Sequence, residues 1–171
     1  MTDIVFIGPS LPADEVARLL PDAVVLPPVA HGDLLRLDVA PGDRVLVIDG
    51  FFLQHPPVRH REILDLLDRG VTVAGAASMG ALRAAELWPF GMRGVGEVFQ
   101  LYRDGVVTGD DEVAVVHGPA EEGHRSFSVP LVNIRWRCAA PSWPACSATP
   151  RPCCCWTSAG TCPSGGGPTG R

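Results

Sequence analysis

The sequence predicts an α/β domain, namely a three-layer Rossmann-like or flavodoxin-like parallel sheet of about five strands, followed by an irregular tail. Two observations lead to this class. Short apolar, β-branched runs alternate with helical patterns five times, which is typical of parallel strands joined by right-handed crossovers. The run RVLVI at 44–48 is apolar throughout, as expected for a strand buried on both faces. We expect the strand order 2-1-3-4-5.

The first part of the chain supplies three strands and two helices. Strands are predicted at 3–7, 23–26 and 44–48, and helices at 13–20 and 59–69. Asp14 and Glu15 fall in the first turn of the first helix, where negative charge suits the helix dipole. Gly70 is expected to end the second helix as the residue just after its C-cap.

The second part supplies two more strands and two more helices. Strands are predicted at 71–74 and 113–116, helices at 81–87 and 97–103, and a glycine-rich loop at 90–96. The strand at 71–74 passes into the helix at 81–87 with almost no loop between them. Small residues such as Gly75 and Gly80 are required there, because a larger side chain would clash where the helix folds back over the sheet.

Ser78 lies at this bend. The surrounding residues AASMG resemble the G-x-S-x-G nucleophile elbow, with alanine in place of the first glycine. Ser78 could act as a nucleophile, or it could cap the helix by accepting a main-chain N–H. Anion binding at the free amides of the helix N-terminus is compatible with both interpretations.

Polar residues follow several of the predicted strands, and parallel sheets bind their ligands at this edge. Asp49, Ser78 and His117 together have the composition of a Ser-His-Asp triad. Each of them could instead be a cap or a turn former. Gly8 and Ser10 belong to the loop that follows the first strand.

Two further pairs of polar residues lie on predicted helices. His60 and Glu62 open the helix at 59–69, where the histidine could act as a base or hold an anion, or simply be exposed. Arg83 and Glu86 are spaced as an i,i+3 pair, which usually forms a solvated surface salt bridge.

Charge is unevenly distributed along the chain. Residues 1–135 contain all 19 acidic residues and 11 of the 14 arginines, and lysine is absent, so this part has a net charge of −8. An acidic domain argues against non-specific nucleic-acid binding and favours a cationic partner surface. The sequence contains no run of about 18 apolar residues, so no membrane span is predicted, and we expect a cytoplasmic protein.

The tail differs from the rest of the chain. We divide the chain into an α/β domain at 1–135 and an irregular tail at 136–171, which is rich in cysteine, proline and glycine. All six cysteines fall after residue 137, and no histidine follows His124. This arrangement of cysteines argues against a metal site in the tail, and we predict none. A disordered extension and a frameshifted C-terminus stay open, and we favour the frameshift because the composition resembles GC-rich DNA read out of frame.

Five phrases distributed over residues 3–135 resemble the TfuA-like family in sequence and in order. They are VFIGPSLPADEVARLLPDA, VIDGFFLQHPPVRHREIL, GVTVAGAASMGALRAAEL, PFGMRGVGEVFQLYRDG and DDEVAVVHGP. The residues carried over by the resemblance are Ser10, Asp49, His60, Glu62, Ser78, Arg83, Glu86, His117 and Glu121. At 51–53 the chain lacks an acid that the family phrase usually has, and past Arg135 the tail replaces the family's helical region.

The resemblance implies a role beside a YcaO-type enzyme that uses ATP to install thioamides in peptide or protein backbones. The TfuA-like protein would supply sulfur by hydrolysing a thiocarboxylated ThiS-like carrier, and would need no cofactor of its own. The peptide substrate would be reached through the YcaO partner, with no nucleic acid or membrane involved. A non-catalytic adaptor that activates the YcaO enzyme, and a truncated product without function, are the alternatives.

Overall fold

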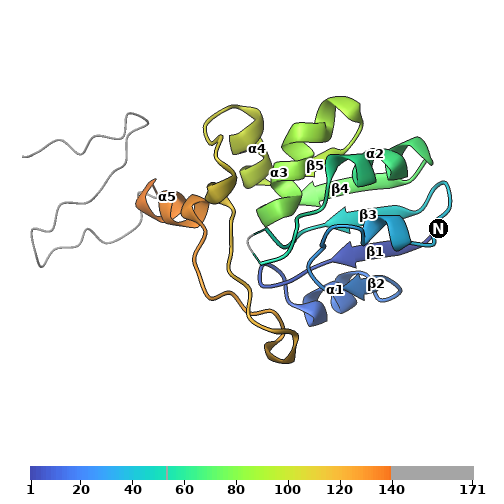
Figure 1. Cartoon of the computed structure of the whole chain (residues 1–171), viewed down its shortest axis with the longest axis horizontal. Helices are drawn as coiled ribbons and strands as arrows, with labels where there is room; N and C mark the ends of the chain where they lie inside the picture. Colours follow the sequence, from blue (N-terminus) through green and yellow to red (C-terminus); the bar gives the residue numbers. More distant parts are fainter. Residues whose placement is uncertain (53, 140–171) are drawn as a thin grey trace, which may run out of the picture. The chain divides into compact units, whose positions relative to one another are not determined.

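A five-stranded parallel sheet forms the centre of this protein in the computed structural model, which describes residues 1–52 and 54–139 (Figure 1). The strands are β1 Asp3–Phe6, β2 Val24–Leu26, β3 Arg44–Val47, β4 Thr72–Ala76 and β5 Arg93–Val95. Their order in the sheet is β2-β1-β3-β4-β5, and every neighbouring pair is parallel. The predicted class is therefore confirmed, and so is the order of the first four predicted strands.

The fifth strand is not the one predicted from the sequence. The segment 113–116 is irregular, whereas β5 lies within the predicted glycine-rich loop at 90–96. Val113 and Val115 are buried, so their alternating pattern reflects core packing without strand pairing. The central residue of β5, Gly94, has to be a glycine, because a Cβ there would overlap the ring of Phe99. The strand therefore lacks the apolar run by which the other strands were predicted.

In residues 1–52 and 54–139, five α-helices and four short 3₁₀ helices connect and follow the strands. The α-helices are α1 Ala13–Leu19, α2 His60–Asp68, α3 Ala77–Leu87, α4 Glu97–Arg103 and α5 Leu131–Ala139. The 3₁₀ helices are η1 Leu34–Arg36, η2 Trp88–Phe90, η3 Asp110–Glu112 and η4 Ala120–Glu122. Gly70 follows the C-cap of α2 with a φ of +80°, in the left-handed region that glycine favours, as predicted.

Helices cover both faces of the sheet, because alternate strand residues point to opposite faces. Val5, Ile7 and Ile48 pack with Val16 of α1 in one apolar cluster. Ile4, Phe6, Val45 and Val47 belong to a second and larger cluster, together with residues of α2, α3 and α4 such as Ile63, Leu66, Leu82 and Phe99. The three-layer arrangement follows from these two clusters.

Met1–Ile134 form one unit of the chain, and a second unit begins at Arg135. Helix α5 includes residues of both, and its last four residues fall within the segment predicted as an irregular tail. From residue 140 onward the tail lies outside the described residues, so its predicted character and the domain boundary remain predictions. No helix in the described ranges is both long enough and apolar enough to cross a membrane.

Candidate functional site

Asp49 organises the loop that follows β1. Its carboxylate is fully buried and accepts hydrogen bonds from the N–H groups of Gly8 at 2.9 Å and Ser10 at 3.0 Å. The hydroxyl of Ser10 donates to the other carboxylate oxygen at 2.7 Å. A Cβ on Gly8 would approach Pro28 Cγ to 2.7 Å, so only glycine fits there. Three predicted site residues therefore meet at the ends of β1 and β3.

Ser78 lies on the tight bend between β4 and α3. Ala77 has a φ of 52°, in the left-handed region that costs an L-residue free energy, and Ser78 has non-helical angles of φ 6° and ψ −130°. A Cβ on Gly75 would overlap the carbonyl oxygen of Gly80, and one on Gly80 would overlap that of Val47. The elbow needs small residues at these two positions because main-chain atoms of α3 and of the sheet lie in direct contact there.

The hydroxyl of Ser78 does not act as a helix cap among the described residues. Ala76 is the N-cap residue of α3, and no side chain caps this end. Ser78 Oγ is half-buried and donates to the carbonyl oxygen of Val113 at 3.5 Å, which is a weak hydrogen bond. Ser78 is therefore held loosely, and its oxygen can take a different partner at little cost.

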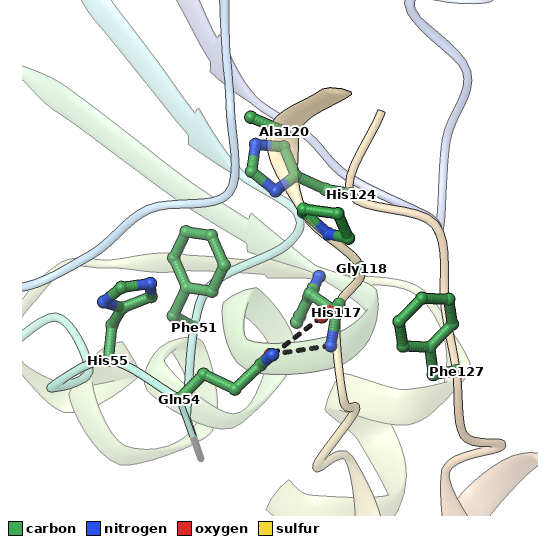
Figure 2. A pocket seen from close by; sticks show the side chains of 9 residues that line it. Phe51, Gln54, His55, His117, Gly118, Ala120, His124 and Phe127 are labelled. Carbon is green, nitrogen blue, oxygen red and sulfur yellow. Dashed lines mark hydrogen bonds between the residues drawn. The ribbon is translucent and has the colours of Figure 1, made fainter. Parts of the chain in front are cut away.

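His117 is buried and its main chain is fixed from both sides. Gln54 Nε2 donates to the carbonyl oxygen of His117 at 2.7 Å, and Gln54 Oε1 accepts from its N–H at 2.8 Å (Figure 2). His117 also forms an isolated antiparallel bridge with Ser126. Contrary to the sequence prediction, His117 is therefore positioned by a side-chain amide and a bridge, and not by a fifth strand.

Neither ring nitrogen of His117 has a partner within ordinary hydrogen-bond geometry among the described residues, but main-chain groups of His124 and Gly50 lie close enough to act on its pKa. Burial lowers the pKa of this imidazole, and the negative charge of Asp49 partly opposes that shift. The ring is therefore neutral at pH 7, with one N–H donor and one acceptor. Unpartnered buried polar groups are uncommon in proteins, and they often mark functional sites.

A pocket of about 400 Å³ opens beside this imidazole (Figure 2). Its walls include Phe51, Gln54, His55, His117, His124 and Phe127. The ring of Phe51 lies at the centre of three imidazoles, with ring-centroid distances of 4.8 Å to His55, 5.1 Å to His117 and 5.5 Å to His124. His124 Nδ1 is also buried without a partner in the described part of the chain.

Asp49, Ser78 and His117, the residues of the predicted triad, form no hydrogen bond with one another in the described residues. The segment Asp49–Gly50 lies close to His117 and to Met79, the residue after Ser78. The main chain of Gly50 and the charge of Asp49 both act on the pKa of His117. On its other side, Gly50 packs so closely on Met79, the neighbour of Ser78, that a Cβ would lie 2.9 Å from Met79 Cγ.

Glu62 has a structural environment. Its carboxylate is buried and accepts from His31 Nδ1 at 2.8 Å and from the N–H groups of Gly32 at 2.9 Å and Arg59 at 3.2 Å. It therefore caps α2 and holds the loop after β2. His60, which was predicted to belong to the same site, is bonded to Glu86 instead.

His60, Arg83 and Glu86 form a separate cluster between α2 and α3. Glu86 Oε2 lies 2.8 Å from His60 Nε2 and accepts from Arg83 Nη1 at 2.6 Å. The prediction of a solvated Arg83–Glu86 pair is wrong for the arginine, whose side chain is only 7% exposed. Arg83 is buried because its Nε donates to the carbonyl oxygen of Val58, where the chain enters α2.

Sequence reasoning missed several residues of the pocket. Gln54, His55, His124 and Phe127 belong to no predicted element, and no spacing pattern connects them with His117. The only available signal was the concentration of three of the five histidines in two loops. Glu121, which the resemblance had included, has an exposed side chain in η4. The described residues contain no group of three His, Cys, Asp or Glu side chains placed to hold a metal ion.

The geometry thus describes an α/β protein whose polar side chains gather at the carboxyl ends of its parallel strands, where folds of this class bind their ligands. Residues 49–143, more than half of the chain, match the family model described as TfuA-like protein. The chain therefore belongs to the TfuA-like family, and the matched segment includes Asp49, Ser78 and His117. A comparison with curated proteins gives no match.

Proposed function

We propose that this protein is an accessory factor for backbone thioamidation, which supplies sulfur to a YcaO-type enzyme by hydrolysing a thiocarboxylated, ThiS-like carrier. Membership in the TfuA-like family gives the biological context. The chemical part is supported by a serine on a strained bend and by a buried imidazole, His117, whose pKa is lowered and whose ring nitrogens have no hydrogen-bond partner in the described residues. ATP is consumed by the partner, and both proteins act in the cytoplasm.

In this mechanism Ser78 Oγ attacks the acyl carbon of the thiocarboxylate, and His117 takes the hydroxyl proton. The C–S bond then breaks, the sulfur leaves as sulfide, and the proton on His117 is available to it. Water, activated by the same imidazole, hydrolyses the acyl ester and regenerates Ser78. His117 is a better base than His60 here, because His60 Nε2 is already bonded to Glu86.

Single-turnover release of sulfide from a thiocarboxylated carrier tests the proposal. Ser78→Ala should lower the release rate by at least about 10³-fold, since the nucleophile is lost. Thr108→Ala removes a hydroxyl from an exposed residue and should leave the rate unchanged. Undiminished sulfide release by Ser78→Ala would exclude Ser78 as the nucleophile.

The second candidate function is a non-catalytic adaptor that docks on the YcaO enzyme and activates it. The acidic character of residues 1–135 favours this role, because docking surfaces often carry complementary charge. Purified protein that never releases sulfide, but that stimulates its partner at a stoichiometric ratio, would establish the adaptor.

A further inference from the structure

His31 belongs to no predicted site and lies in the loop that follows β2. Its main-chain N–H donates to the carbonyl oxygen of Pro56 at 2.9 Å. Two residues earlier, Val29 forms a parallel bridge with Gly50, which follows β3. His31 therefore lies at the carboxyl edge of the sheet, where folds of this class bind their ligands.

The side chain of His31 is oriented by a buried carboxylate. Glu62 Oε1 lies 2.8 Å from His31 Nδ1, and the side chain of Glu62 is only 3% exposed. The same carboxylate accepts from the main-chain N–H groups of Gly32 and Arg59, so its position is fixed. Because an ionised carboxylate only accepts hydrogen bonds, Nδ1 carries the hydrogen, and the lone pair of the neutral ring is on Nε2.

Nε2 of His31 is on the edge of the ring that is turned away from this carboxylate. In the described residues, Glu62 is the hydrogen-bond partner of the imidazole, and Nε2 has none. The side chain of His31 is 38% exposed, and its Nδ1 faces the protein, so the edge with Nε2 faces the solvent. A carboxylate that holds the tautomer, together with a second ring nitrogen that is open, is the arrangement of a histidine that acts as a general base.

Two other histidines lack this combination. Both ring nitrogens of His117 are buried, so they offer no surface to a water molecule from the solvent. His60 also pairs with a glutamate, but it does so through Nε2, and Glu86 is shared with Arg83. Among the described histidines, His31 alone has its Nδ1 on a buried carboxylate.

The loop of His31 and the elbow of Ser78 both pack against Gly50. A Cβ on Gly50 would lie 2.9 Å from Val29 Cγ1 and 2.9 Å from Met79 Cγ. Val29 precedes His31 by two residues, and Met79 directly follows Ser78. A base in this loop is therefore on the same edge of the sheet as the elbow.

We propose that Nε2 of His31 is a general base that activates water at this edge of the sheet, with Glu62 as its positioning residue. Resting on the proposed function, this water hydrolyses the acyl ester of Ser78. Nε2 takes a proton from the water, the water oxygen forms a bond to the acyl carbon, and the bond from that carbon to Ser78 Oγ breaks. The proton then passes from Nε2 to Oγ, and a carboxylic acid leaves. His117 remains the base of the first step, and His31 replaces it in this second one.

Hydrolysis of p-nitrophenyl acetate by the complete protein tests the proposal without the carrier. Acetylation of Ser78 releases p-nitrophenolate in a burst, and hydrolysis of acetyl-Ser78 sets the later steady rate. His31→Gln should keep the burst and lower the steady rate at least about 10²-fold, so that acetyl-Ser78 accumulates and is detected by intact-mass spectrometry. His60→Gln removes the other glutamate-paired histidine and, as the matched control, should change neither phase.

The tautomer of His31 shows whether Glu62 positions it. At about pH 9, where an imidazole is neutral, two-bond ¹H–¹⁵N spectra should show the hydrogen of the wild-type ring on Nδ1. In Glu62→Gln, an amide NH₂ in place of Oε1 donates to Nδ1, which moves the hydrogen to Nε2 and removes the open lone pair. The steady rate should then fall at least about tenfold with the burst retained. A glutamate that only caps α2 would leave the tautomer unchanged.

Three outcomes would overturn the proposal: an unchanged steady rate in His31→Gln, a burst that falls together with the steady rate in this variant, or hydrogen on Nε2 in the wild-type ring. Absence of acetyl-Ser78 in the wild type would remove the nucleophile and the water step together. Sulfide release from a thiocarboxylated carrier is measured separately. Both phases with p-nitrophenyl acetate but no sulfide would remove the proposed sulfur supply and keep His31, and sulfide release with an unchanged steady rate in His31→Gln would remove His31 alone.

Discussion

At the scale of single residues, two buried polar groups differ in how they are satisfied. The carboxylate of Asp49 accepts three hydrogen bonds from the loop after β1. The imidazole of His117 has none in the described residues. A buried polar group without a partner typically costs about 1–3 kcal/mol of folding free energy. Asp49 therefore stabilises the loop, whereas the imidazole of His117 is kept at a cost in stability.

The lowered pKa of His117 predicts how stability depends on pH. Because the folded state binds the proton more weakly than the unfolded chain, protonation favours unfolding. The contribution of neutral His117 is complete above the unfolded pKa of about 6.5 and is lost as the pH falls below it. The urea midpoint should therefore decrease between about pH 6.5 and pH 5, and decrease less in His117→Gln.

Other groups with shifted pKa values titrate outside this window. The hydrogen bond from Arg44 lowers the pKa of Asp3, and that from the main chain of Ala40 lowers the pKa of Asp43, both from 3.8. They destabilise the protein only at lower pH. An identical pH dependence in the wild type and His117→Gln would show that His117 is not the responsible group.

At the scale of elements, the junction between β4 and α3 positions the candidate site. The helix begins directly at the end of the strand and packs main chain to main chain on β3 through Gly80, whose N–H donates to the carbonyl oxygen of Ile48 at 3.2 Å. This close contact places Met79, the residue after Ser78, against Gly50. The close packing at the elbow therefore requires a residue without a Cβ at position 80.

Gly80→Ala tests this dependence. In an ordinary helix the change stabilises by about 1 kcal/mol, because alanine has the higher helix propensity. Here the added methyl group would overlap the carbonyl oxygen of Val47, so we expect a loss of about 3 kcal/mol in the free energy of unfolding by urea.

Gly105→Ala serves as the control for this change. Its Cβ would meet no atom within 4 Å, and only its left-handed φ of +69° is strained, at a cost of about 1–2 kcal/mol. A Gly80→Ala protein as stable as the wild type would contradict the main-chain packing of α3.

At the scale of the whole molecule, the net charge bears on which partner surfaces the protein can bind. The net charge of −8 over residues 1–135 opposes binding to other acidic surfaces. If the YcaO-type partner has a cationic docking surface, the complex depends on interactions that salt screens.

The affinity for the proposed YcaO-type partner should therefore fall as salt rises from about 0.1 M to about 0.5 M. Isothermal titration calorimetry over this range measures the Kd. The loss of affinity should come mainly from slower association, because long-range attraction accelerates association and salt screens it. A Kd that does not change with salt would show that the acidic surface takes no part in docking.

Much of the fold could be predicted because its signals are local. Branched apolar runs marked four of the five strands, and Gly70 marked the end of α2. The fifth strand was misplaced because β5 is short and contains Gly94, which is explained only by the ring of Phe99 packed against it. The buried valines at 113 and 115 imitated a strand, since core packing and sheet pairing can produce the same alternation.

The sequence by itself determined the class of fold, four of the five strands, the elbow at Ser78 and the TfuA-like family, because each depends on residues close together in the chain or on an ordered set of such phrases. Only the tertiary structure decided that Asp49 serves the β1 loop, that Glu62 caps α2, and that His117 shares a pocket with Phe51 and His124. These contacts join segments up to about seventy residues apart in a single fold. The physical reason is that hydrogen-bond partners and burial are properties of the packed chain, which no local pattern specifies.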